Sequence, residues 1–117
     1  MTIKECYAMA DADFDDVLKR LGSEAMVKRF AVKFLNDTSF EDLKEGIRLQ
    51  DGEKAFRAAH TLKGVSQNLG FTKLYEVSAK LTEELRGGKP LVHKELVDAV
   101  DQIHQTIIDN LGELDTE

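Results

Sequence analysis

Apolar residues recur at spacings of three and four positions along most of the chain, which is the pattern of amphipathic helices. The pattern is clearest in the C-terminal half, where the recurring residues are Leu74, Val77, Leu81, Leu85, Leu96, Val100, Ile103, Ile107 and Leu111. Alternation of apolar and polar positions, which would predict a strand, is hard to find. We therefore expect every regular element to be a helix.

Residues that begin and end helices divide the chain into six predicted segments. The side chains of Asp13 and Ser23 are suited to cap helix N-termini, and Thr38 or Ser39 begins the third segment. Glycines suited to helix C-termini follow several of the segments. The predicted helices cover residues 13–21, 23–35, 39–51, 53–68, 72–86 and 91–111. The second of them has a predicted apolar face made of Val27, Phe30, Ala31, Phe34 and Leu35.

Short connections between the predicted helices favour antiparallel neighbours. The simplest architecture is an all-α, antiparallel up-and-down four-helix bundle with one or two short additional N-terminal helices. A length of 117 residues is typical of one domain, so we expect a single domain over residues 1–117.

The helix predicted over residues 53–68 carries a histidine on its polar side. A helical wheel at about 100° per residue places the apolar stripe on Ala55, Ala59, Leu62, Ser66 and Leu69. His60 falls about 140° from the middle of that stripe, so its imidazole is expected to face solvent. Phe56 lies beside it on the wheel and is the best candidate for an exposed apolar contact.

Three residues that share this face suit a phosphoryl group on the histidine. Lys63, one turn later, places an ammonium where the negatively charged phosphoryl oxygens would sit. Gly64 costs about 1 kcal/mol in a helix interior relative to alanine, and it clears space beside the imidazole for another molecule. Gln67 is placed to donate a hydrogen bond to the same oxygens or to the ring. Each residue alone is commonplace on a helix surface, and only their combination predicts a site.

Charge is distributed unevenly along the chain. Sixteen Lys and Arg residues oppose 22 Asp and Glu residues, which gives a net charge of −6 and argues against binding to nucleic acid. Residues 54–75 contain four cations and no carboxylate, so this segment carries +4 and the remainder −10. A nearby carboxylate would repel an anion on His60, so the missing acids favour the phosphoryl interpretation.

Residues 60–70, HTLKGVSQNLG, resemble the signature of histidine-containing phosphotransfer (HPt) domains. The pattern of that family is H-x-L-K-G-x-S-x-x-L-G, and every specified position is met here. The resemblance covers nearly the whole chain. One departure is Ser78, where many members carry a cysteine; this position is expected to pack inside the bundle, so the change bears on stability.

The resemblance implies that His60 accepts a phosphoryl group from the aspartyl phosphate of a receiver domain and passes it to another receiver. It also implies that Lys63 stabilises the phosphoryl group, Gly64 leaves room for it and Gln67 helps to orient the site. The expected partners are receiver domains of response regulators and a hybrid histidine kinase. The chain is expected to be a monomer without kinase activity and without a cofactor, with Mg²⁺ supplied by the receiver.

Two other interpretations stay open from the sequence. A helical adaptor or docking module would bind receiver domains without phosphotransfer, although the intact motif argues against it. A carboxylate-bridged metal bundle needs two Glu-x-x-His pairs, and only Asp101-x-x-His104 comes near that pattern. His93 and His104 share a helix face but lie about 16 Å apart by helical rise, so both are expected at the surface or rim.

Targeting segments are not evident in the sequence. The N-terminal residues have no apolar run suited to a signal peptide, and no segment approaches about 18 apolar residues. The single Cys6 excludes a disulfide within the chain and fits a reducing compartment. We therefore expect a cytoplasmic protein that does not associate with membranes.

Overall fold

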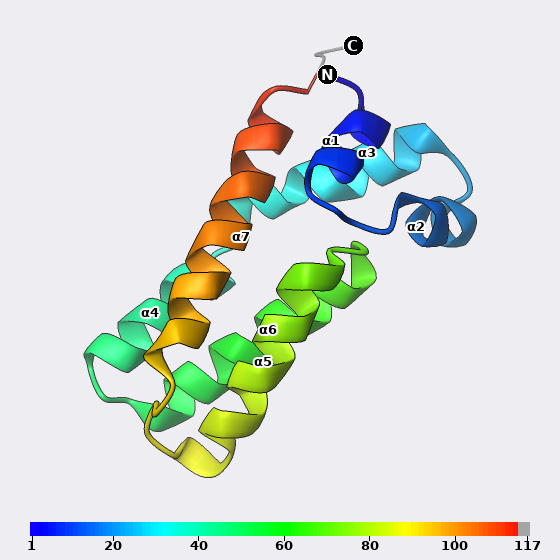
Figure 1. Cartoon of the computed structure of the whole chain (residues 1–117). Coiled ribbons are helices and arrows are strands. Elements are labelled where there is room, and N and C mark those ends of the chain that lie inside the picture. The colour runs from blue at the N-terminus through cyan, green and yellow to red at the C-terminus, as the bar shows by residue number, and fades with distance from the viewer. Residues whose placement is uncertain (115–117) are drawn as a thin grey trace.

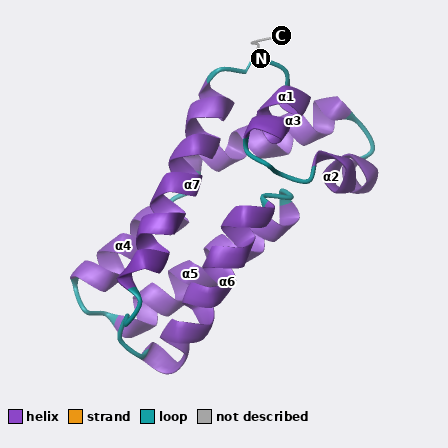
Figure 2. Cartoon of the chain, in the orientation of Figure 1, coloured by secondary structure: helices purple, strands orange, loops and turns teal. Residues whose placement is uncertain are grey.

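The computed structural model describes residues 1–114, and every regular element within them is a helix (Figures 1 and 2). The α-helices are α1 (Ile3–Met9), α2 (Phe14–Leu21), α3 (Glu24–Val32), α4 (Ser39–Arg48), α5 (Gly52–Asn68), α6 (Thr72–Leu85) and α7 (Lys94–Gly112). Two short 3-10 helices, η1 (Lys33–Asn36) and η2 (Arg86–Gly88), follow α3 and α6. The prediction of an all-α fold is confirmed.

Helices α4 to α7 form the bundle, and short turns at residues 49–51 and 69–71 make α4, α5 and α6 antiparallel neighbours (Figure 1). Helix α5 packs against both α4 and α6, and α6 packs against α7. Fully buried side chains from all four helices meet in the core, among them Leu43, Leu62, Leu81 and Val100. The up-and-down four-helix bundle predicted from the apolar spacing is confirmed.

The starts of α2 and α3 follow from capping hydrogen bonds that the sequence predicts. The side chains of Asp13 and Ser23 accept hydrogen bonds from the backbone N–H groups of the first turns of α2 and α3. Asp51, which was predicted to end the preceding helix, instead caps α5 in the same way, so α4 ends at Arg48 and α5 begins at Gly52. Gly70 has a φ of +71° and reverses the chain between α5 and α6, as a left-handed residue at a helix end does.

Helix α1 is an element that the apolar pattern does not delimit. It begins with a capping box, in which Thr2 and Glu5 exchange side-chain-to-backbone hydrogen bonds. A helix of seven residues is too short to be stable alone, so its stability comes from tertiary contacts. Ile3, Cys6 and Tyr7 supply these contacts because all three are buried. The capping box was the sequence signal that could have located this helix.

The helix predicted over residues 23–35 differs from the structure. Helix α3 ends at Val32, and the next turn is the 3-10 helix η1. Val27, Ala31 and Phe34 are buried, whereas Phe30 and Leu35 are 36% and 40% exposed, so part of the predicted apolar face is wrong. The physical reason is that this segment buries only a narrow stripe, and the tighter 3-10 turn rotates the residues after Val32 relative to α3.

Candidate functional site

Helix α5 carries His60 at its middle and directs the side chain away from the core. The stripe predicted from the wheel is buried, with Ala59 and Leu62 fully enclosed on the two sides of His60 in the sequence. His60 itself is exposed, as the wheel predicts. Its ring lies 6.1 Å from that of half-buried Phe56, centroid to centroid, and makes no hydrogen bond to any residue that the structure describes. The imidazole is therefore open to another molecule.

Gly64, one turn after His60, has no internal reason to be a glycine. Its φ is not positive, and a Cβ built on it would meet nothing within 4 Å. Gly46 is a contrast, because a Cβ there would lie 2.6 Å from the backbone nitrogen of Ala55. Since the fold does not need a glycine at position 64, the free space beside His60 is available to a partner.

Carboxylates from outside residues 54–75 pair with most of the cations of this segment; two of them come from distant parts of the chain, and Glu53 comes from one turn earlier on α5. Three of its four cations form ion pairs with carboxylates from outside residues 54–75, with N–O distances of 3.4 Å for Lys54–Glu45, 3.8 Å for Arg57–Glu53 and 2.9 Å for Lys73–Asp11. Lys63 is the exception, because it makes no ion pair within the described part of the chain. The positive charge that stays unpaired is therefore the one beside His60.

Lys63 and Gln67 share the face of α5 that holds His60. Lys63 is half-buried and Gln67 is exposed. Long helical side chains lean toward the N-terminus of their helix, so the ammonium of Lys63 leans back toward the turn that holds His60. No hydrogen bond joins Gln67 to His60 in the described residues.

Glu83 near the end of α6 and Arg86 at the start of η2, neither of which belongs to the predicted site, line its other side. The guanidinium of Arg86 lies 5.3 Å from the centre of the Phe56 ring and makes two hydrogen bonds to Glu83, at 2.8 and 3.1 Å. Hydrogen bonds and charge from Arg86, with a smaller contribution from the charge of Lys63, hold the pKa of Glu83 below its usual range. The i, i+3 spacing of Glu83 and Arg86 predicts their pairing, but only the packing of α6 on α5 places the pair beside Phe56.

On the opposite side of His60, a pocket of about 350 Å³ lies between α5 and the start of α4. Its lining includes Arg57 and Thr61 from α5, together with Asp37, Ser39 and Asp42. The groups are mixed in charge, since two carboxylates stand against the cations of α5. The pocket adds a polar surface beside the residue that follows His60, and this surface has no excess of positive or negative charges.

The other two histidines lie away from this face. His93, before α7, is exposed, and its Nδ1 lies 2.5 Å from an oxygen of Glu84. His104 is half-buried between the rings of Phe34 and Phe40, which agrees with the predicted place at the rim but adds aromatic contacts that were not predicted. The sequence did not predict this because η1, which supplies Phe34, reaches His104 only in the folded chain. No cluster of three or more potential metal ligands occurs among residues 1–114.

Comparison with known proteins gives one match. A family model described as the Hpt domain matches residues 35–114, which include all of α4 to α7 and His60. Searches of curated proteins and of solved structures returned no match. Within the described residues, no helix has both the length and the apolar character needed to cross a bilayer.

Proposed function

The chain belongs to the Hpt domain family, and from this premise we propose that His60 carries the phosphoryl group in a phosphorelay. The family implies a part in histidine phosphotransfer, as an intermediate and not as a kinase. The observation that carries the assignment to this residue is the exposure of His60 at mid-helix, beside the unpaired cation of Lys63 and the open space at Gly64.

The chemistry requires only a nucleophilic nitrogen and room for an in-line approach. Neutral imidazole, with a usual pKa of about 6.5, has a free electron pair on one ring nitrogen near pH 7. That nitrogen attacks the phosphorus of an aspartyl phosphate; the N–P bond forms, the P–O bond breaks, and the aspartate leaves as a carboxylate. The proton on the other ring nitrogen stays in place. Reversal onto a second aspartate completes the relay.

The residues around His60 have separate parts in this proposal. Lys63 stabilises the phosphoryl oxygens by charge, Gly64 admits the receiver's active site, and Gln67 donates a hydrogen bond that orients the group. The receiver domain supplies the divalent cation, which neutralises charge during transfer. The partners are receiver domains of response regulators or of a hybrid histidine kinase, which the chain meets as a monomer.

Phosphotransfer from purified receiver domains tests this function. We expect label from a phosphorylated receiver to appear on the wild-type chain in an acid-labile, base-stable form. His60→Gln should remove the label, whereas His93→Gln, which alters another exposed histidine, should retain it. If His60→Gln still takes label, the site is elsewhere. If the wild type binds receivers but takes label from none, the chain is a docking module, which is the second interpretation.

A further inference from the structure

The α6 side of the His60 site contains a chain of contacts that the phosphotransfer motif does not include. The ring of Phe56 lies between His60 and Arg86, and Arg86 holds Glu83 through two hydrogen bonds. Both members of the Glu83–Arg86 pair are more than half exposed. A carboxylate therefore stands beside a site that must receive an anion.

The antiparallel packing of α5 and α6 places Glu83 close to the level of the phosphoacceptor. The two helices meet at the turn around Gly70, and Gly52 near the start of α5 closely approaches Gly88, just after α6. By this register Glu83 stands about one turn from the level of His60. Side chains lean toward the N-terminus of their own helix, so Lys63 and Glu83 lean toward the level of His60 from opposite directions.

We propose that Glu83 is a positioning residue that attracts Lys63 in the unphosphorylated site and competes with the phosphoryl group for it. This inference rests on the proposed function of His60. Arg86 holds the Glu83 carboxylate through its two hydrogen bonds. Lys63 forms no ion pair with Glu83 in the described structure, but its charge helps to lower the pKa of that carboxyl. Phosphorylation turns Lys63 from Glu83 to the phosphoryl oxygens, which carry more negative charge.

The competition gives Glu83 a defined effect on the relay. Attraction between Glu83 and Lys63 stabilises the unphosphorylated site, and the same attraction weakens the pairing of Lys63 with the phosphoryl oxygens on His60. Both effects weaken retention of the phosphoryl group and favour its onward transfer. Because the groups are partly exposed, we expect an effect of about two- to fivefold, the size that such pairs typically give.

A ³¹P NMR titration tests the proposal without a receiver. Phosphoramidate phosphorylates His60 directly: the N–P bond to His60 forms, the N–P bond of the reagent breaks, and ammonia leaves. The measured quantity is the affinity of the bound phosphoryl group for its last proton. Glu83→Gln should weaken proton binding about two- to fivefold, because Lys63 then pairs fully with the phosphoryl oxygens. Glu83→Asp, which keeps the charge, should stay closer to the wild type.

Two further variants separate the proposed role from a general charge effect. Asp98→Asn removes an exposed carboxylate from α7 and should leave the titration unchanged. In a Lys63→Met background, Glu83→Gln should lose most of its effect, because Glu83 acts through Lys63. The proposal is overturned if Glu83→Gln leaves the proton affinity of the phosphoryl group unchanged. It is also overturned if Glu83→Gln shifts that affinity equally in the wild-type and the Lys63→Met backgrounds. Circular dichroism confirms that each variant is folded.

The proposed function fails in a different way. It fails if the wild-type chain takes no label from phosphorylated receivers, whatever the titration of chemically phosphorylated His60 shows. When label is taken, the equilibrium between receiver and His60 should shift toward His60 about two- to fivefold in Glu83→Gln. The shift should shrink as salt is raised, because screening weakens interactions between exposed charges.

Discussion

Gly64 is a residue at which stability and the proposed function favour different side chains. Glycine inside a helix loses more conformational entropy on folding than alanine, and the structure has room for a methyl group at this position. We predict that Gly64→Ala stabilises the protein by up to about 1 kcal/mol in urea denaturation and slows phosphotransfer from receivers. Gly46→Ala is the matched control and should destabilise, because its Cβ would overlap the backbone of Ala55. Unchanged transfer in Gly64→Ala would show that the space is not used.

Ser78 is a second residue whose side chain lowers the stability of the fold, and a substitution can measure by how much. It is fully buried in α6, and its hydroxyl oxygen has no hydrogen-bond partner among the described residues. The buried hydroxyl of Ser66, by comparison, donates to the carbonyl oxygen of Leu62 at 2.7 Å. The expected burial of position 78 inside the bundle is thus confirmed.

We predict that Ser78→Ala raises the free energy of unfolding by about 1 kcal/mol, since an unpaired buried polar group is removed. Ser66→Ala should lower it by about 1 kcal/mol, since a buried hydrogen bond is lost. Chemical denaturation of both variants measures the difference. A loss of stability in Ser78→Ala as large as that in Ser66→Ala would contradict the argument.

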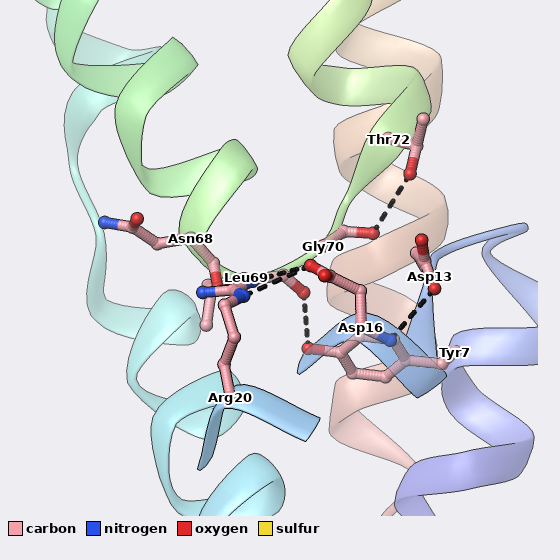
Figure 3. A network of polar contacts seen from close by, with 8 residues as sticks. All are labelled: Tyr7, Asp13, Asp16, Arg20, Asn68, Leu69, Gly70 and Thr72. Atoms are coloured by element: carbon pink, nitrogen blue, oxygen red, sulfur yellow. Dashed lines mark hydrogen bonds and ion pairs between the residues drawn. The ribbon is translucent and has the colours of Figure 1, made fainter. Parts of the chain in front are cut away.

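At the scale of elements, the N-terminal helices fix the end of α5 (Figure 3). The last carbonyl groups of a helix have no partner within it, and here other elements supply the donors. The hydroxyl of Tyr7 donates to the carbonyl of Leu69 at 2.6 Å, and Arg20 Nη2 donates to that of Asn68 at 2.9 Å. The N–H of Asp13 donates to the carbonyl of Gly70 at 2.8 Å. Helices α1 and α2, which precede the family match, thus hold the turn that orients α5 against α6.

We predict that Tyr7→Phe lowers the free energy of unfolding by about 1–2 kcal/mol, because it leaves the buried carbonyl of Leu69 without its donor. Tyr75→Phe is the control and should change stability little, since the Tyr75 hydroxyl makes no hydrogen bond in the described structure. Thermal or urea unfolding provides the measurement. Equal effects of the two substitutions would argue that the ring of Tyr7, and not its hydroxyl, stabilises the turn.

At the scale of the whole molecule, His104 joins the N-terminal part to the bundle and makes stability depend on pH. Its ring lies 5.4 Å from that of Phe34 in η1 and 4.9 Å from that of Phe40 in α4, centroid to centroid. Burial, reinforced by the charge of Lys44, lowers the pKa of His104, although Asp37, Asp101 and Glu41 oppose this. The fold therefore favours the neutral ring.

Because the pKa of His104 is lowered in the folded state, protonation of this ring destabilises the fold. The stabilisation from neutral His104 is complete above the usual histidine pKa of about 6.5 and is lost as pH falls through the lower pKa of the folded state. We predict that stability falls less steeply between pH 7 and pH 5 in His104→Gln than in the wild type, measured by denaturation at each pH.

The effect of His93 on stability has the opposite dependence on pH, because its contact with Glu84 raises its pKa. Its contribution is present below about pH 6.5 and lost as pH rises through the raised value.

The sequence predicted the bundle well because its information is periodic and local. Apolar residues spaced three and four positions apart predicted four long helices, and the capping side chains of Asp13 and Ser23 placed the starts of α2 and α3. The same wheel gave the exposure of His60 on α5. Local rules were insufficient for η1, and for α1 they offered only the capping box, because both elements depend for their stability on contacts with distant parts of the chain. The roles of His60, Lys63, Gly64 and Gln67 stay predictions.

By itself, the sequence determined the helical fold, the exposed His60 and the neighbours that one helix brings to it, because helix geometry fixes which residues share a face. Only the tertiary structure decided the charge around that face. Residues 54–75 contain no carboxylate, but folding brings Glu45 to Lys54 and Asp11 to Lys73. Arg57 pairs locally with Glu53 one turn earlier on α5, and Lys63 alone is left unpaired among these cations in the described residues. Electrostatic interactions act through space, so the charge of Lys63 contributes to the lowered pKa of Glu83 although the two residues lie on different helices.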